Sequence, residues 1–208
     1  MRKLVAILPA VVPERVLKHD LFQRASFIPS LLYNLIRSKM SGREWYSRID
    51  DSIVLGALPF RSLVEELLYA EGVTAVISLN QDFELRFCAD GAFWRSLEVE
   101  FLQIPTADIF AAPDADKLRE GVLFILDHMR RRGARCTVYV HCKAGRTRSA
   151  TLVGCYLMQR YGYTPDECVK VMQAARSHIL LVEIQMAALK EYYERYVKPL
   201  TNNKSSVG

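Results

Sequence analysis

The segment that most constrains the fold runs from His141 to Ser149 and reads His-Cys-Lys-Ala-Gly-Arg-Thr-Arg-Ser. It follows a run rich in β-branched and aromatic residues, Cys136–Val140, and precedes a helical pattern that starts near Thr147. This order predicts a buried strand, a tight loop and a helix. The loop can curl so that its backbone N–H groups face one anion, and the N-terminus of the helix adds partial positive charge at the same point. The segment therefore predicts a phosphate pocket.

Two side chains of this pocket carry chemistry. Arg148 lies six residues after Cys142, and its planar guanidinium can bind two phosphate oxygens at once. In that positive field the thiolate of Cys142 is favoured over the thiol, so Cys142 is predicted to be a nucleophile at neutral pH. The structural alternative is a buried cysteine at the end of a strand, followed by an ordinary turn. The joint spacing of cysteine, glycine and arginine argues against that alternative.

The rest of the loop is predicted to support the phosphate. Gly145 suits a tight turn that a Cβ would obstruct. His141 is expected to brace the loop in a buried position, and Ser149 or Thr147 to donate a hydrogen bond to the sulfur. Lys143 and Arg146 either favour a substrate with more charge than one phosphotyrosine or lie on a solvated rim. The predicted phosphate-binding residues are Lys143, Ala144, Gly145, Arg146, Thr147 and Arg148.

A phosphatase of this kind needs a carboxylic acid that protonates the leaving oxygen. Asp108 is the favoured candidate, because it follows a predicted strand that ends near Ile104 and so lies on a loop. Asp114 and Asp116 are alternatives, but both begin the next helix, where an N-terminal capping role explains them. For Asp108 itself the alternative is a solvated aspartate in a turn.

Strand and helix patterns alternate along the chain, which predicts an α/β fold with a central, mainly parallel sheet flanked by helices. The phosphate loop lies between a strand and a helix of this fold. A capping-box pattern with proline in the first turn, at Thr164–Glu167, marks one helix start. Strands are predicted at 53–58, 73–79, 99–104 and 136–140, and helices at 27–37, 62–70, 114–132, from about 147 to 161, from 164 and at about 184–197.

The charge of the chain is concentrated at its start. Residues 1–40 hold seven Lys and Arg against two acids, which leaves 21 basic and 21 acidic residues in the rest of the chain. A neutral body argues against nucleic acid as a partner. The basic segment 1–26 is predicted to be an extension, either an organelle transit peptide or a segment that is retained. Residues 27–198 form the predicted phosphatase domain, and 199–208 a disordered tail.

The five cysteines show no paired or zinc-binding spacing, so we expect free thiols, a reducing compartment and no metal. Cys155 and Cys168 fall in helical patterns and are expected in the core. No apolar run approaches the roughly 18 residues that a membrane span needs. The mostly apolar helix at 27–37 has two interpretations, which are packing against the core and lying on a membrane surface.

The Cys142–Arg148 spacing with Ser149 after it resembles the cysteine-dependent dual-specificity phosphatases. Within that family, the segment 141–151 is most similar to the mitochondrial phosphatases that convert phosphatidylglycerophosphate to phosphatidylglycerol on the way to cardiolipin. Further similarity lies at 44–50, 55–59 and 79–87. The resemblance covers roughly residues 27–197.

This resemblance implies Cys142 as nucleophile, Arg148 as phosphate clamp and Asp108 as general acid. It also implies a reaction without magnesium or another cofactor, on an anionic phospholipid, at the matrix face of the inner mitochondrial membrane and by a peripheral protein. Two departures bear on headgroup preference. The family's Glu-Glu-Tyr-Glu loop is Gln-Asp-Phe-Glu at 81–84, and Val182-Glu183 lies where an Arg-Pro pair is usual.

Three functions compete on this basis. The first is a phosphatidylglycerophosphatase that works through a phosphocysteine. The second is a dual-specificity protein phosphatase or phosphoinositide phosphatase with the same pocket, for which phosphoproteins are candidate partners. The third is a phosphate-binding module without catalysis, which the presence of both Cys142 and Asp108 disfavours.

Overall fold

The computed structural model describes residues 20–108, 111–133 and 136–199. In this part of the chain a five-stranded sheet has the order β1-β2-β5-β3-β4. Neighbouring strands from β2 to β4 are parallel and β1 is antiparallel, so the predicted mainly parallel sheet is confirmed. The strands are β1 (Tyr46–Arg48), β2 (Ile53–Gly56), β3 (Val73–Ser78), β4 (Glu100–Gln103) and β5 (Thr137–His141). The edge strand β1 was not predicted.

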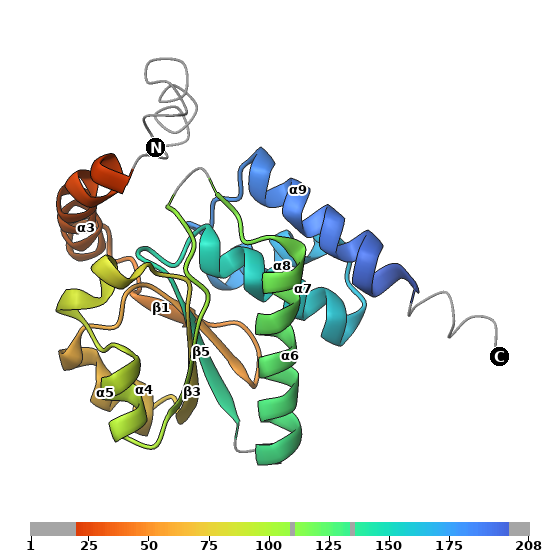
Figure 1. Ribbon diagram of the computed structural model, residues 1–208, viewed down its shortest axis with the longest axis horizontal. Helices are drawn as coiled ribbons and strands as arrows, with labels where there is room; N and C mark the ends of the chain where they lie inside the picture. Colours follow the sequence, from red (N-terminus) through yellow and green to blue (C-terminus); the bar gives the residue numbers. More distant parts are fainter. Residues whose placement is uncertain (1–19, 109–110, 134–135, 200–208) are drawn as a thin grey trace.

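Helices cover both faces of the sheet (Figure 1). One buried cluster joins the sheet to α4 and α5, and a larger one joins it to α6, α7, α8 and α9. The helices are α3 (Asp20–Ser41), α4 (Val64–Tyr69), α5 (Gly91–Ser96), α6 (Ala115–Arg132), α7 (Arg148–Tyr161), α8 (Pro165–Ala175) and α9 (Glu183–Tyr192). Short turns precede α4 at η1 (Arg61–Leu63), precede α5 at η2 (Asp82–Phe87) and extend α9 at η4 (Tyr193–Val197).

Local chemistry explains where the elements begin. Strands β2 and β5 are buried at every position, as expected for parallel strands covered on both faces. The Thr164 hydroxyl accepts from the Glu167 N–H and the Glu167 carboxylate accepts from the Thr164 N–H, so the predicted capping box starts α8. Asp114 caps α6 by accepting from the N–H of Lys117.

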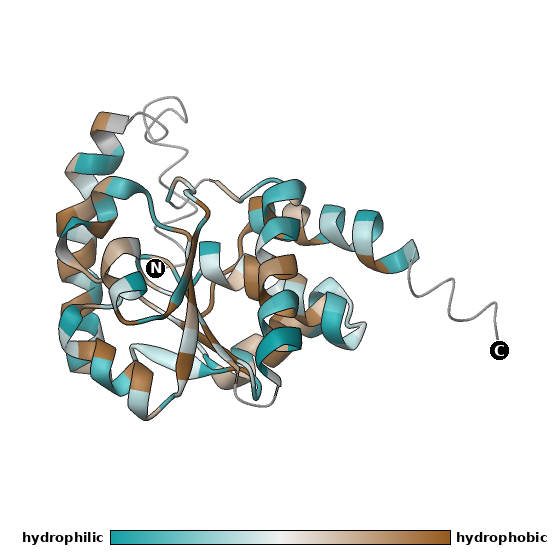
Figure 2. Ribbon diagram, turned by 60° about the horizontal axis from the view of Figure 1, so that its bottom comes forward, coloured by the Kyte–Doolittle hydropathy of each residue, from teal (hydrophilic) through white to brown (hydrophobic). Residues whose placement is uncertain are grey.

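The helix predicted at 27–37 is longer than expected. It is α3, from Asp20 to Ser41, and it crosses the predicted domain border at residue 27. Phe27 and Leu31 are buried in a small cluster with Leu58, so one face packs against the core. The opposite face exposes a row of apolar side chains, and Figure 2 shows hydrophobic segments along the outer side of this helix. That row comprises Leu21, Ile28, Leu32, Tyr33, Ile36 and Met40.

Other expectations have mixed outcomes. Cys155 and Cys168 are buried, as predicted, and all five thiols are free. Asp116 does not cap α6, because its carboxylate accepts from the Tyr196 hydroxyl and pairs with Arg195. No helix in the described ranges is both long and apolar enough to cross a membrane. The predicted extension, up to residue 19, and the tail, from residue 200, lie outside the described residues.

Helix α6 allows a matched test of the packing. Leu118 is fully buried, whereas Leu123 is 52% exposed although it belongs to the apolar pattern of the same helix. We expect Leu118→Ala to lower the free energy of unfolding by about 2–5 kcal/mol, because it leaves a cavity in the core. Leu123→Ala should lower it by less than about 1 kcal/mol. Urea denaturation followed by circular dichroism measures both, and equal losses would contradict the packing described.

Candidate active site

The loop between β5 and α7 holds its carbonyl groups away from its concave side. The carbonyl of Lys143 accepts from the N–H of Leu58 at 3.4 Å, and that of Arg146 from the N–H of Leu180 at 3.1 Å. The carbonyl of Gly145 accepts from Nε of Arg176 at 2.8 Å. Because a peptide carbonyl and the following N–H point in opposite directions, these bonds turn the loop's N–H groups inward, as an anion cradle requires.

Gly145 is required for this path. Its φ is +61°, and a Cβ at this position would lie 2.4 Å from the backbone carbon of Gly56. Neither the left-handed backbone nor that close approach to β2 is compatible with a larger residue. The sequence prediction for Gly145 is therefore explained by packing against β2 as well as by the turn.

Cys142 follows directly after β5 at the base of the cradle and is 2% exposed. The Ser149 hydroxyl, rather than that of Thr147, donates a hydrogen bond to Sγ at 3.2 Å. Burial opposes ionisation, but the guanidinium of Arg148, the Ser149 hydroxyl and backbone N–H groups together lower the pKa of the Cys142 thiol below its ordinary value. A thiolate so stabilised is a competent nucleophile.

Arg148 is fully buried at the first position of α7 and is bound by both oxygens of Glu84. The two bonds measure 2.8 and 3.0 Å, and Nη1 also donates to the carbonyls of Leu79 and Thr106. Burial disfavours its charge, yet the neighbouring Asp108 and Glu84 carboxylates raise the pKa of Arg148 overall. The arginine therefore stays cationic beside the thiol.

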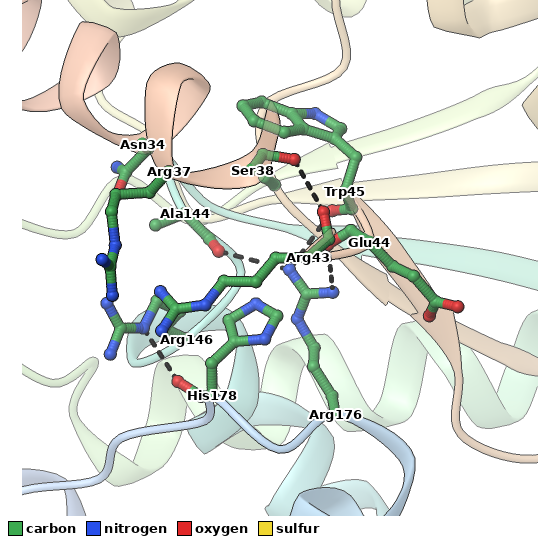
Figure 3. Close-up of a pocket in the computed structure, with 11 residues that line it drawn as sticks. Asn34, Arg37, Ser38, Arg43, Glu44, Trp45, Ala144, Arg146, Arg176 and His178 are labelled. Carbon is green, nitrogen blue, oxygen red and sulfur yellow. Dashed lines mark hydrogen bonds between the residues drawn. The ribbon is translucent and has the colours of Figure 1, made fainter. Parts of the chain in front are cut away.

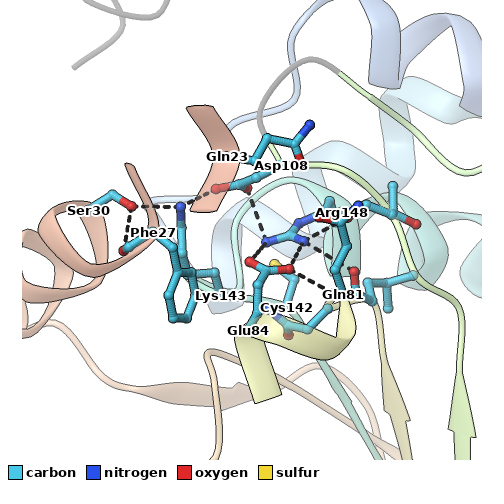
Figure 4. Close-up of polar contacts among 12 residues, drawn as sticks. Gln23, Phe27, Ser30, Gln81, Glu84, Asp108, Cys142, Lys143 and Arg148 are labelled. Atoms are coloured by element: carbon cyan, nitrogen blue, oxygen red, sulfur yellow. Dashed lines mark hydrogen bonds and ion pairs between the residues drawn. The ribbon is translucent and has the colours of Figure 1, made fainter. Parts of the chain in front are cut away.

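Asp108 lies over the loop, between two cations (Figure 4). Its Oδ1 is 3.1 Å from Nη2 of Arg148, and its Oδ2 forms an ion pair with Nζ of Lys143. Lys143 also donates to the hydroxyl of Ser30 on α3 at 2.8 Å. The structure thus brings the predicted acid to the predicted nucleophile's pocket. It also excludes the solvated-rim interpretation for Lys143, which is buried.

His141 and Arg146, two further residues predicted for the site, differ in their burial and in their contacts. His141 is fully buried and stacks on Tyr139 with ring centres 5.6 Å apart. Burial lowers the pKa of His141 to about 3, so its ring is neutral at pH 7 and fits the predicted bracing position. Arg146 is half-buried at the edge of the loop, where its Nε donates to the carbonyl of His178 at 2.8 Å.

A cavity of about 130 Å³ opens above the loop. Its lining combines the charged residues Lys143, Arg146 and Asp108 with the apolar residues Leu180 and Val182. Ser30, Tyr33 and Asn34 of α3 complete the wall. The cavity can therefore admit a charged headgroup while offering apolar contact to the group that carries it.

Two residues that hold this geometry were not predicted from the sequence. Glu84 was noted only as part of an altered loop, although an acid within the apolar-flanked segment 83–87 is a signal of a buried partner. Arg176 is buried and donates to the carbonyls of Glu44, Trp45 and Gly145, which ties the phosphate loop to the segment before β1. Its role depends on contacts between distant segments, which no local pattern shows.

Comparison with known proteins agrees with this geometry. The catalytic domain of dual specificity phosphatases matches residues 60–195. The human phosphatidylglycerophosphatase and protein-tyrosine phosphatase 1 is 42% identical over 188 residues, which are 88% of this chain and 92% of the human protein. The chain belongs to the dual specificity phosphatase family. The fold and the enzyme class predicted from the sequence are therefore confirmed.

Two other similarities place this dual specificity phosphatase more closely. The Arabidopsis thaliana phosphatidylglycerophosphate phosphatase PTPMT1 is 38% identical over 171 residues, covering 82% of this chain and 49% of that protein. A crystal structure of PTPMT1 in complex with PI(5)P superposes with a TM-score of 0.71 at 36% identity, covering 76% of this chain and 99% of that one.

The hydrogen bond from Ser149 to the sulfur can be tested separately from turnover. Ser149→Ala removes a donor that stabilises the thiolate, so the pKa of Cys142 should rise by about one unit, the equivalent of one hydrogen bond to a charged group. The pH at which inactivation by iodoacetate reaches half its maximal rate reports this change. Ser177→Ala, an exposed residue outside the loop, is the control. An unshifted midpoint in Ser149→Ala would refute the assignment.

Proposed function

We propose that this phosphatase hydrolyses phosphatidylglycerophosphate to phosphatidylglycerol, the lipid that feeds cardiolipin synthesis. The observation that carries the proposal is the pairing of Cys142, whose thiol has a lowered pKa, with Arg148 at the two ends of a loop that lines a cavity with both charged and apolar residues. The relatives named phosphatidylglycerophosphatase support the choice of lipid.

In the first step Sγ of Cys142 attacks the phosphorus of the terminal phosphate, and the bond from phosphorus to the glycerol oxygen breaks. The loop N–H groups and Arg148 stabilise the charge on the phosphoryl oxygens. Asp108 supplies a proton to the leaving oxygen. In the structure its carboxylate is paired with Arg148 and Lys143, so we infer that incoming phosphate takes over these cations and that Asp108 takes up a proton and turns to the leaving group.

In the second step water attacks the phosphocysteine, and Asp108, now a carboxylate, accepts the proton of that water. Inorganic phosphate and the thiolate are the products. The Ser149 hydroxyl, 3.2 Å from Sγ, stabilises the sulfur as it leaves. All steps use side chains of this chain, and Glu84 keeps Arg148 in place throughout.

We further propose that the enzyme acts on lipid at a membrane surface, as a peripheral protein of the matrix face of the inner mitochondrial membrane. Helix α3 carries Arg24, Arg37 and Lys39 together with its exposed apolar row. Such a helix can lie in the interface of an anionic membrane. The same helix lines the cavity through Ser30, Tyr33 and Asn34, which puts the proposed lipid contact beside the pocket. The basic, acid-poor segment 1–26 supports the mitochondrial assignment.

A substrate panel tests the function. Full-length protein in mixed micelles should show a kcat/KM for phosphatidylglycerophosphate at least tenfold above those for PI(5)P and a phosphotyrosine peptide, because the lipid offers both charged and apolar groups to the mixed lining of the cavity. Release of inorganic phosphate measures each rate. A higher kcat/KM for PI(5)P or the peptide would replace the proposed function with a phosphoinositide or protein phosphatase.

The acid and the nucleophile have a test of their own. Cys142→Ser should abolish hydrolysis. Asp108→Ala should slow the first step on the lipid by about 10²–10⁴-fold. The same change should cost much less with p-nitrophenyl phosphate, because nitrophenolate leaves without a proton. Asp114→Ala, which removes only the cap of α6, is the matched control. An equal loss in the control, or equal losses on both substrates, would refute the role of Asp108.

A further inference from the structure

A second cavity, of about 30 Å³, lies beside the phosphate loop, which contributes Ala144 and Arg146 to its lining. It shares Asn34, Ala144 and Arg146 with the cavity above the loop, so the two are neighbours with a common wall. Its volume admits a compact group of a few heavy atoms and not an acyl chain. The cavity thus differs from the first in size as well as in its lining.

Three guanidinium groups converge at this cavity (Figure 3). Arg37 comes from α3, Arg43 from the segment after that helix and Arg146 from the phosphate loop. The three are far enough apart in sequence that no helical spacing forces them together. Burial, the charge of Arg43 and the charge of Arg37 all lower the pKa of Arg146, so the cations repel one another where they stand. An anion at their centre would reverse this cost.

The other titratable residues that line the cavity, Glu44, Arg176 and His178, do not contribute to binding an anion at the centre of the three arginines. The side chain of Glu44 is exposed and accepts from the Ser47 hydroxyl, and in Figure 3 its carboxylate points away from the cluster. Arg176 directs its donors to backbone carbonyls and to Ser47, so it forms the wall. Burial, Arg176 and Arg146 lower the pKa of His178 to about 3, so this ring is neutral and adds no charge.

We propose that Arg37, Arg43 and Arg146 form a second oxyanion site, which binds the phosphodiester group of the substrate while the terminal phosphate lies over Cys142. This inference rests on the proposed function, because phosphatidylglycerophosphate carries both groups on one glycerol unit. Arg146 belongs to the walls of both cavities and to the loop that holds the terminal phosphate, so the two sites adjoin, as two anions on one glycerol unit require. The second site recognises the phosphodiester by its charge. The monoester is distinguished by its reaction with Cys142.

Kinetics on two substrates test the site. In Arg43→Gln and in Arg37→Gln, the ratio of kcat/KM for phosphatidylglycerophosphate to that for p-nitrophenyl phosphate should fall about tenfold, through the KM for the lipid, since each variant loses a hydrogen bond to a charged group. Lys190→Gln removes an exposed charge of α9 that does not line the cavity and should leave the ratio within twofold. An unchanged ratio in Arg43→Gln and Arg37→Gln, or an equal fall in Lys190→Gln, would overturn the proposal.

A binding measurement separates this inference from the proposed function. Short-chain phosphatidylglycerophosphate is titrated calorimetrically into Cys142→Ser and into Cys142→Ser with Arg43→Gln. A tenfold weaker affinity in the second protein supports the diester site even if the wild-type enzyme prefers another substrate. Equal affinities overturn the site even if the wild-type enzyme hydrolyses the lipid. If Arg43→Gln instead weakens inhibition of p-nitrophenyl phosphate turnover by inorganic phosphate, the ligand is free phosphate and the diester assignment is wrong.

Discussion

The buried guanidinium of Arg148 is the constraint on which the rest of the site depends. A cation with no exposed surface is stable only when carboxylates and hydrogen-bond acceptors compensate its charge. Glu84 supplies a bidentate pair from η2, and the carbonyls of Leu79 and Thr106, in the segments that follow β3 and β4, accept from Nη1 of Arg148. Four separate segments are therefore held in register around one charge. Loss of Glu84 would leave the contact with Asp108 as the remaining ion pair of Arg148 among the described residues.

The two carboxylates around Arg148 are not equivalent, and the difference bears on mechanism. Glu84 is 2% exposed, engages Arg148 through both oxygens and also accepts from the N–H of Gln81, so it is fixed in place. Asp108 is 19% exposed and reaches Arg148 through one oxygen at 3.1 Å. An incoming phosphate therefore displaces Asp108 from Arg148 more easily than it displaces Glu84. Asp108 is also the carboxylate that is proposed to act on the leaving group.

Sequence patterns predicted the sheet, the phosphate loop and Asp108, because each has a local signature. Buried parallel strands appear as continuous apolar runs, and Cys142, Gly145 and Arg148 have a fixed spacing. Glu84 and Arg176 were not predicted because their partners are distant in sequence. The length of α3 was also missed. Pro29 lies inside α3, and the outer face of the helix carries apolar side chains as a buried face would. The sequence pattern therefore indicates neither where α3 begins and ends nor which of its faces is buried.

Helix α3 connects the chemistry to the surface of the molecule. Phe27 fixes the helix against the core, and Ser30 on the same helix accepts a hydrogen bond from Lys143, the partner of Asp108. Two turns further along, Arg37 lines the second cavity. A helix that contacts Lys143 on one side and exposes an apolar row on the other links the proposed lipid surface to Asp108, the proposed general acid. The contact between Ser30 and Lys143 is therefore where the proposed membrane contact and the proposed acid catalysis meet.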